Sequence, residues 1–153
     1  MGRVHQINVS DGGVPKLPVE TAMVDESGIV GDRQADRVNH GHPHQALCLF
    51  SLEVIEAFQA EGHPIEPGNA GENITVSGVD WAQIVPGVTM TIGSVTIEVT
   101  DFAGPCVKNA GWFTDRFFNR MEVDRFPGES RVYARVLHGG PIARGDSVEL
   151  LDQ

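Results

Sequence analysis

Short apolar runs, separated by glycine and proline, make up most of this chain. Its 153 residues include 18 glycines and nine prolines, spread throughout. Glycine weakens the interior of a helix and proline breaks it, so a chain interrupted this often has little room for long helices. Short strands between turn residues are typical of an all-β barrel or sandwich. The sequence therefore predicts a mainly β fold with a few short helices, in a single domain over residues 1–153.

Apolar or alternating runs predict where the strands lie. We expect strands at residues 4–9, 19–24, 46–50, 73–76, 90–92, 95–100, 130–138 and 145–151. Gly93-Ser94 suits a tight turn, so the fifth and sixth of these runs are expected to form a hairpin. Ser51 is expected to cap a helix over residues 52–61, and a second helix is expected over residues 113–121.

The strand at residues 130–138 carries charged side chains on one face. Period-two alternation places its apolar residues on one side and Arg131, Tyr133 and Arg135 on the other. A solvated face is one interpretation. The other is a cleft lined by a phenol and two guanidinium groups, which bind phosphate with two parallel hydrogen bonds. The strand by itself leaves both interpretations open.

The net charge is −10, which disfavours binding to nucleic acid or to an anionic membrane surface. The basic residues are unevenly placed, because no lysine or arginine occurs between Arg37 and Lys108. If the two ends of the chain meet in space, an acidic protein can still hold a local cationic pocket. Such a pocket would suit a small anionic ligand.

Neither a signal peptide nor an apolar stretch of membrane-spanning length is visible in the sequence. The two cysteines are therefore expected in a reducing compartment, and we expect a cytoplasmic protein without a disulfide.

The two cysteines have different surroundings. Cys48 lies within an apolar run and is expected to be a small core residue. Cys106 follows a strand, comes directly after Gly104-Pro105, and is followed two residues later by Lys108. A nearby cation favours the thiolate, which is both the nucleophile and the metal ligand. Cys106 is thus placed either to bind a soft metal or to react.

Three histidines alternate in the polar segment at residues 31–46. On a strand, His40, His42 and His44 would share a face, and such pairs can hold zinc or iron. Glycine and proline stand between them, however, and a metal site would need a further ligand such as Glu72 or His138. The sequence favours solvated histidines and leaves a metal site open.

Common nucleotide-binding and hydrolase motifs are missing from the sequence. The glycine-rich block at residues 68–75 can offer backbone N–H groups to a phosphate, but it lacks the Gly-Lys-Ser/Thr of a Walker loop. The sequence also lacks a dinucleotide-binding fingerprint. It has no Gly-x-Ser-x-Gly elbow, which argues against a serine hydrolase. No protease signature surrounds Cys106.

An ordered series of motifs resembles the MOSC domain, named after the C-terminal part of molybdenum cofactor sulfurase. The series begins with Gly-x-x-Gly-Asp at residues 28–32, then His-Gly at 40–41, Gln-Ala at 45–46 and Pro-Gly-Asn-Ala-Gly-Glu-Asn-Ile-Thr at 67–75. It continues with Pro-Cys at 105–106, Val-Tyr-Ala-Arg-Val-Leu-x-Gly-Gly at 132–140 and Gly-Asp-x-Val at 145–148. The resemblance runs from about residue 19 to residue 150. One block departs from the family, because His42 stands where a second glycine is usual.

The resemblance implies a barrel-like β fold that binds the molybdenum cofactor, a molybdopterin dithiolene that carries a phosphate. In reductase members the motif cysteine binds molybdenum, and the enzymes reduce N-hydroxylated compounds. In sulfurase-type members the cysteine has been proposed to carry sulfur. Cys106 is therefore the expected molybdenum ligand, or alternatively the persulfide site of a sulfur-carrier or cofactor-transfer module.

The resemblance also suggests the residues around Cys106. His40 and Asp32 are candidate proton donors in the reaction, and the candidates for the cofactor pocket are Arg33, Asn73, Lys108, Arg131, Tyr133 and Arg135. No flavin, haem or iron–sulfur motif is present, so a reductase of this kind needs a separate electron-donor protein, and a sulfur carrier needs a sulfur donor. A β-barrel binding module that has lost the cofactor is a third possibility.

Overall fold

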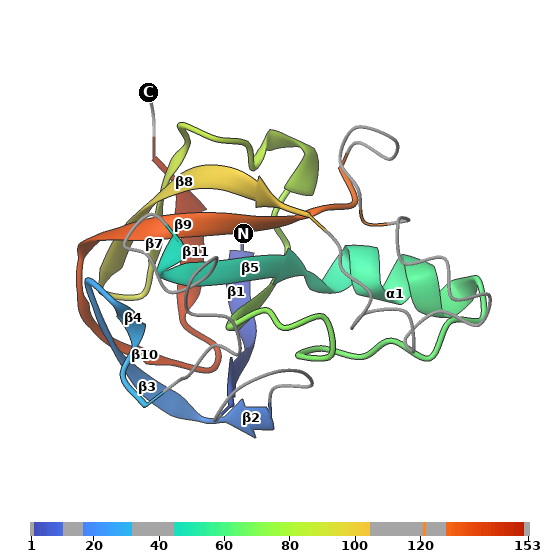
Figure 1. The fold of residues 1–153 in the computed structure, drawn as a ribbon, viewed down its shortest axis with the longest axis horizontal. Helices are drawn as coiled ribbons and strands as arrows, with labels where there is room; N and C mark the ends of the chain where they lie inside the picture. The colour runs from blue at the N-terminus through green and yellow to red at the C-terminus, as the bar shows by residue number, and fades with distance from the viewer. Residues whose placement is uncertain (1, 11–16, 32–44, 105–120, 122–127, 152–153) are drawn as a thin grey trace.

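A closed β-barrel forms the body of the protein (Figure 1). The structure is a computed structural model that describes residues 2–10, 17–31, 45–104, 121 and 128–151. Around the barrel the strands follow the order β11-β7-β8-β9-β5-β6-β1, and β1 pairs with β11 to close the ring. The bounds of these strands are β1 Gly2–Val9, β5 Leu47–Ser51, β6 Ile74–Ser77, β7 Thr89–Ile92, β8 Val95–Ala103, β9 Arg131–His138 and β11 Ser147–Leu150. The predicted mainly β barrel is confirmed.

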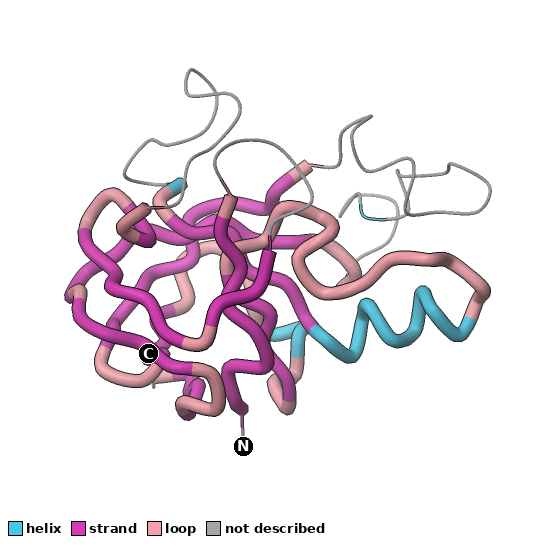
Figure 2. Tube along the Cα trace, turned by 90° about the horizontal axis from the view of Figure 1, so that it is seen from below, coloured by secondary structure: helices cyan, strands magenta, loops and turns pink. Residues whose placement is uncertain are grey.

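A helix makes the one parallel pairing among these strands possible. β5 and β6 are parallel, and parallel neighbours need a crossover connection. Helix α1, Leu52–Ala60, supplies it and extends beyond the ends of the strands (Figure 2). Its start is the predicted one, because the Oγ of Ser51 accepts a hydrogen bond of 3.2 Å from the backbone N–H of Val54.

Four further described strands lie outside the ring. β3, Thr21–Asp25, pairs with β4, Gly28–Ile29, and with β10, Gly140–Ala143, to form a small antiparallel sheet. β2, Leu17–Val19, pairs instead with β1. The run expected as one strand at residues 19–24 is therefore divided, because the chain passes from one sheet to the other at Glu20.

Strand β10 was missed in the sequence because it contains Gly140 and Pro141. Proline cannot donate to a strand ladder and is tolerated at a sheet edge. β10 is such an edge, since in the small sheet it pairs only with β3.

Gly28 shows why the first glycine of the Gly-x-x-Gly-Asp motif is needed. Its φ is +113°, which L side chains rarely adopt, and a Cβ there would collide with the carbonyl oxygen of Ala46. The glycine allows β4 to pass directly beside the start of β5.

The predicted hairpin is confirmed as β7 and β8, with register pairs from Ile92↔Val95 to Thr89↔Glu98. Alternate residues of β8 point into the barrel, where Val95, Ile97 and Val99 are buried. The second predicted helix, over residues 113–121, lies outside the described residues except for Met121, which is buried. In the part of the chain that the structure covers, no helix is long and apolar enough to cross a membrane.

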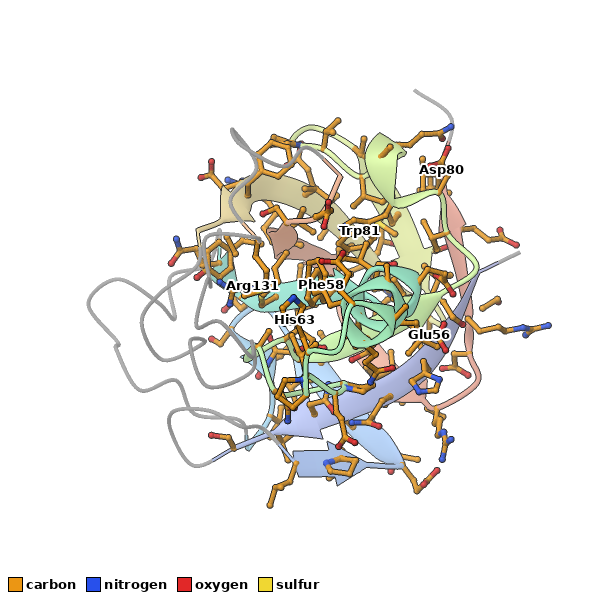
Figure 3. All side chains as sticks on the ribbon, turned by 90° about the vertical axis from the view of Figure 1, so that its right-hand side faces the viewer. Glu56, Phe58, His63, Asp80, Trp81 and Arg131 are labelled. Carbon is orange, nitrogen blue, oxygen red and sulfur yellow. The ribbon has the colours of Figure 1, made fainter. Side chains whose placement is uncertain are left out.

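Aromatic side chains connect α1 to the barrel (Figure 3). Phe58 is fully buried, and its ring centroid lies 6.4 Å from that of Phe50 on β5. The ring of Phe50 also lies 6.5 Å from Trp81, the first residue of the 3₁₀ helix η2, Trp81–Gln83. This apolar contact holds the crossover helix in place.

Replacing Phe58 with alanine should lower the free energy of unfolding by about 3–5 kcal/mol, because it removes a fully buried ring and leaves a cavity. Urea denaturation followed by tryptophan fluorescence measures this change. Glu56→Ala, on the exposed face of the same helix, should change stability by less than about 0.5 kcal/mol. Equal effects of the two substitutions would contradict this account of how α1 packs.

Candidate functional site

The segment that carries Cys106 leaves the barrel where β8 ends and β9 begins. Ala103, the last residue of β8, pairs with Arg131, the first residue of β9. Gly104 is the last described residue before Cys106, two positions along the chain. The described residues around Gly104 are therefore the part of the candidate site that the structure shows.

Arg131 joins this exit point to a second segment, residues 68–73, which we call the 68–73 loop. One terminal nitrogen donates to the carbonyl oxygen of Ala70 and the other to that of Gly104, both at 2.7 Å. Only 7% of Arg131 is exposed, and its Nε has no hydrogen-bond partner among the described residues. A guanidinium group can make both bonds because its donors form a rigid fork.

Glu72 holds the 68–73 loop from inside. Its Oε2 accepts hydrogen bonds from the backbone N–H of Gly68 at 3.0 Å and from the hydroxyl of Thr75 at 2.9 Å. Its own carbonyl oxygen accepts a bond of 3.2 Å from the side-chain amide of Asn8. Glu72 is completely buried, and its Oε1 has no hydrogen-bond partner in the part of the chain that the structure describes.

Burial raises the pKa of Glu72, because the charged form is poorly solvated inside the protein. The hydrogen bonds from Gly68 and Thr75 and the charge of Arg131 act in the opposite direction, but burial outweighs them. The carboxyl group therefore favours its neutral form more than an exposed glutamate does.

Asn73, a candidate for the cofactor pocket, bonds to the neighbouring strand. Its Oδ1 accepts from the backbone N–H of Cys48 at 2.7 Å, and its own N–H donates to the carbonyl oxygen of Cys48, also at 2.7 Å. Asn73 is 1% exposed, so its side chain is buried in the wall of the barrel, where it connects the 68–73 loop to β5.

Tyr133 is buried beside Cys48 and Ala103. Cys48 and Tyr133 are register partners on β5 and β9. Cys48 is 5% exposed, which confirms that it is a core residue. The first half of this face of β9, which contains Arg131 and Tyr133, is therefore covered by protein. The interpretation of a solvated face is wrong for these two residues.

Arg135 has a different environment. Its side chain is half exposed, and its Nε lies 3.5 Å from Oε1 of Glu98 on β8. Four residues of strand place it about 13 Å from Arg131 along β9. Exposed pairs of this kind contribute less than about 1 kcal/mol, so Arg135 can exchange partners at little cost.

The two ends of the chain meet, because β1 pairs with β11. The described basic residues do not all gather where they meet. Arg3 donates to the carbonyl oxygen of Gly145 at 3.4 Å, and Arg144 lies 3.7 Å from Glu20. Of the arginines in the described part, Arg131 is the one that lies at the exit of the Cys106 segment.

The other predicted site residues, Cys106, Lys108, Asp32, Arg33 and His40, lie outside the described residues, as do His42 and His44. Their roles stay predictions. Within the described ranges, no group of three or more His, Cys, Asp or Glu side chains is placed to hold a metal ion. Glu72 is buried in its loop and His138 is exposed at the opposite end of β9.

Sequence reasoning missed what Glu72 does, since it was named only as a further metal ligand. The sequence contained a hint, because Glu72 is a single charged residue between glycines and a buried strand. A carboxylate at such a point often binds the backbone N–H groups of its own turn. The partners of Arg131 could not be predicted either. Ala70 and Gly104 accept its hydrogen bonds through their backbone carbonyl groups, so their side chains give no indication of this contact.

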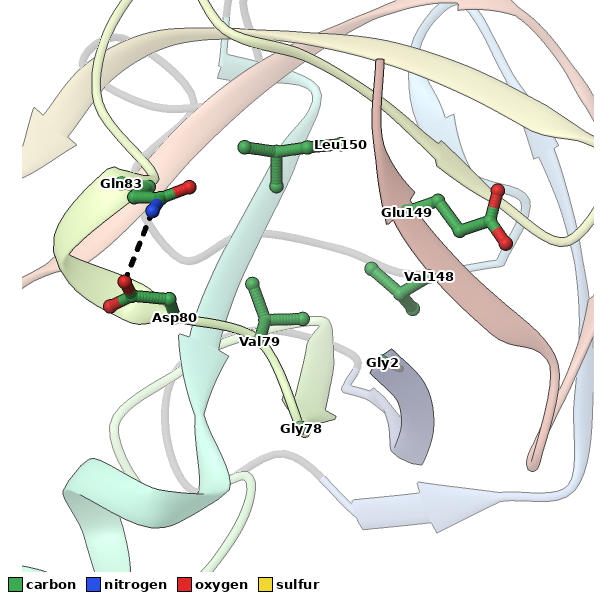
Figure 4. A pocket seen from close by; sticks show the side chains of 8 residues that line it. All are labelled: Gly2, Gly78, Val79, Asp80, Gln83, Val148, Glu149 and Leu150. Carbon is green, nitrogen blue, oxygen red and sulfur yellow. Dashed lines mark hydrogen bonds between the residues drawn. The ribbon is translucent and has the colours of Figure 1, made fainter. Parts of the chain in front are cut away.

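Three surface hollows that are lined by described residues lie along residues 78–85. One of about 390 Å³ is lined by residues of this segment and of β1 and β11: Gly2, Gly78, Val79, Asp80, Gln83, Val148, Glu149 and Leu150 (Figure 4). A smaller one, of about 190 Å³, includes Phe102 and Ser130, the neighbours of Ala103 and Arg131 in sequence. Trp81 also lines it and donates from its ring N–H to the carbonyl oxygen of Ser130 at 2.7 Å. This smaller hollow adjoins the exit of the Cys106 segment.

The pKa of Glu72 predicts a pH-dependent stability. A carboxyl group whose pKa is higher in the folded than in the unfolded protein stabilises the fold fully at low pH, and this stabilisation is lost as the pH rises through the folded pKa. The stability of the wild type relative to Glu72→Gln should therefore fall above pH 4.5, by at most about 1.4 kcal/mol per pH unit.

Urea denaturation of both proteins between pH 4 and pH 8 tests this expectation. Glu56→Gln, at an exposed position of α1, is the matched control for a simple change in net charge. A stability difference that stays constant or grows with pH would show that burial does not dominate at Glu72.

Comparison with known proteins places this barrel in a family. The family model of the MOSC domain matches residues 36–149. The chain is 30% identical to the uncharacterized protein YflK of Bacillus subtilis over 144 residues, which are 92% of this chain and 64% of YflK. It is 29% identical to protein YiiM of Escherichia coli over 100 residues, 62% of this chain and 45% of YiiM. The chain therefore spans less than two thirds of either relative.

Solved structures share the fold at lower identity. The crystal structure of YiiM from Geobacillus stearothermophilus superposes with a TM-score of 0.78 at 23% identity, covering 99% of this chain and 76% of the other. The YUAD protein of Bacillus subtilis gives the same TM-score at 17% identity, covering 98% of this chain and 96% of the other. The matched motifs, the barrel and the family model agree, and this chain belongs to the MOSC domain family.

Proposed function

We propose that this protein binds the molybdenum cofactor at the end of the barrel, with Cys106 as the metal ligand, and reduces N-hydroxylated compounds. The observation that carries the proposal is the family match over residues 36–149, which includes the Pro105-Cys106 motif. Thiolate is a soft ligand and suits a metal that is already bound by dithiolene sulfurs.

The charges of the described residues support an anionic group at this position. The protein has a net charge of −10, yet a buried guanidinium lies at the exit of the Cys106 segment. Arg131 makes two described hydrogen bonds with its five N–H donors, and no described residue accepts a bond from its Nε. The donors that remain are compatible with a phosphate-bearing cofactor.

Other residues have supporting roles in this proposal. Lys108, Arg33 and Arg135 would contribute cations to the phosphate, and Asn73 and Tyr133 would shape the wall of the pocket. Arg135 is suited to this role because its pair with Glu98 is exposed and weak. His40 and Asp32 would deliver the protons that reduction of an N–OH bond consumes.

When bound, the cofactor supplies a redox-active metal centre, and a separate donor protein supplies the electrons. One relative supports a reductase. A protein named "Reductase" from Gibberella moniliformis is 26% identical over 133 residues, 83% of this chain. The match covers 23% of that protein, so its other parts have no counterpart in this comparison.

Metal analysis of protein produced in a host that makes the cofactor tests the proposal. The wild type should contain about one molybdenum per chain, and Cys106→Ser should lose most of it. Cys48→Ala is the matched control, because Cys48 is buried in the barrel and should not affect the metal content. Reduction of a synthetic amidoxime with a chemical electron donor should follow the molybdenum content across these variants.

The same samples distinguish the alternative function. A sulfur carrier would show cyanide-labile sulfur that depends on Cys106, without molybdenum and without turnover. That result would contradict the reductase and favour a module that transfers sulfur or the cofactor from a donor protein. Neither molybdenum nor labile sulfur would leave a binding module without the cofactor.

A further inference from the structure

Two buried ionisable residues, Glu72 and Arg131, lie near the exit of the Cys106 segment, and three of the four described hydrogen bonds of their side chains are with the backbone. Glu72 is 0% exposed and Arg131 is 7% exposed. Charged residues are rarely buried to this extent, because removing them from water is costly. The cost of burying them here points to a task that a smaller apolar residue cannot perform.

The contacts of Arg131 connect segments that are distant in sequence. Its partner Ala70 is 61 positions away and its partner Gly104 is 27 positions away. Among the described strands, no pairing joins the 68–73 loop to the end of β8, since β6 and β8 are not neighbours in the barrel. The guanidinium hydrogen-bonds both segments directly.

The loop that Arg131 contacts is itself held at several points. Glu72 binds Gly68 and Thr75 through its carboxyl group, and Asn73 is bonded to Cys48 on β5. A segment held in this way is a firm support. Through Arg131, that support reaches Gly104, whose carbonyl group precedes Pro105-Cys106.

We propose that Arg131 is a positioning residue, whose forked contact with Ala70 and Gly104 sets where the Cys106 segment starts relative to the 68–73 loop. Glu72 takes part by holding the loop in the shape that presents the carbonyl group of Ala70. Only the consequence for molybdenum rests on the proposed function. The contact and its effect on the backbone do not.

Two substitutions separate positioning from charge. Arg131→Lys keeps the positive charge, but one nitrogen cannot reproduce the fork that reaches both carbonyl groups. Arg131→Met removes the charge as well. Arg144→Met is the matched control, because Arg144 is an exposed arginine that lies 3.7 Å from Glu20, away from these segments.

Amide hydrogen exchange followed by NMR on the cofactor-free proteins is the first measurement. In both Arg131 variants, exchange at Gly68, Gly71, Asn73 and Ala103 should accelerate about tenfold or more, as expected for the loss of hydrogen bonds to a charged group. Amides of the β7–β8 hairpin, such as that of Ile97, should keep their wild-type rates. Arg144→Met should resemble the wild type throughout.

The reaction rate of Cys106 with iodoacetamide, located by peptide mass spectrometry at constant pH, is the second measurement. It should change severalfold in both Arg131 variants and stay constant in Arg144→Met. If the proposed function is correct, both Arg131 variants should also lose most of their molybdenum, although Lys keeps the charge.

Wild-type exchange in Arg131→Lys would overturn the proposal, since charge alone would then suffice. An equal acceleration at the hairpin amides would also overturn it, because Arg131 would then stabilise the whole fold. Absence of molybdenum from the wild type would contradict the proposed function and leave the exchange result valid. Full molybdenum in both variants, with wild-type exchange, would contradict the positioning role and leave the function valid.

Discussion

Closure of the barrel is the constraint on which the other features depend. β1 and β11 pair through Gly2↔Val148 and Arg3↔Ser147, so each strand of the ring has a neighbour on both sides. A closed ring leaves no free edge among its strands and an interior that apolar side chains must fill. It also fixes which strand ends can approach one another. The start of β9, the end of β8 and the 68–73 loop are brought together in this way.

At that end of the barrel, polar groups are buried and have to be satisfied by one another. Glu72, Asn73 and Arg131 bind mainly backbone N–H and C=O groups, which is the usual way for a buried loop to avoid a large desolvation cost. Through Arg131, these bonds also connect the 68–73 loop to Gly104 at the end of β8. A positive charge is thereby held beside the backbone of Gly104, two positions before Cys106 in the sequence, in a protein that is otherwise strongly acidic.

Much of the architecture could be predicted because it depends on local patterns. The β7–β8 hairpin follows from alternation on both sides of Gly93-Ser94, and α1 follows from its cap at Ser51. β10 could not be found in this way, since Gly140 and Pro141 suppress a strand pattern that only pairing with β3 explains. Of the candidate site, Arg131, Tyr133 and Asn73 could be named in advance, but their partners could not. Those partners are backbone groups from distant segments, and backbone groups are the same in every residue.

The sequence by itself determined the mainly β barrel and the family, because turn residues, alternation and ordered motifs are local properties of a chain. Only the tertiary structure decided the difference between the two arginines of β9. Alternation places Arg131 and Arg135 on the same face, yet one is buried between two carbonyl groups and the other is half exposed beside Glu98. The reason is that burial depends on what lies across the strand. The 68–73 loop covers the start of β9 and leaves Arg135 in water.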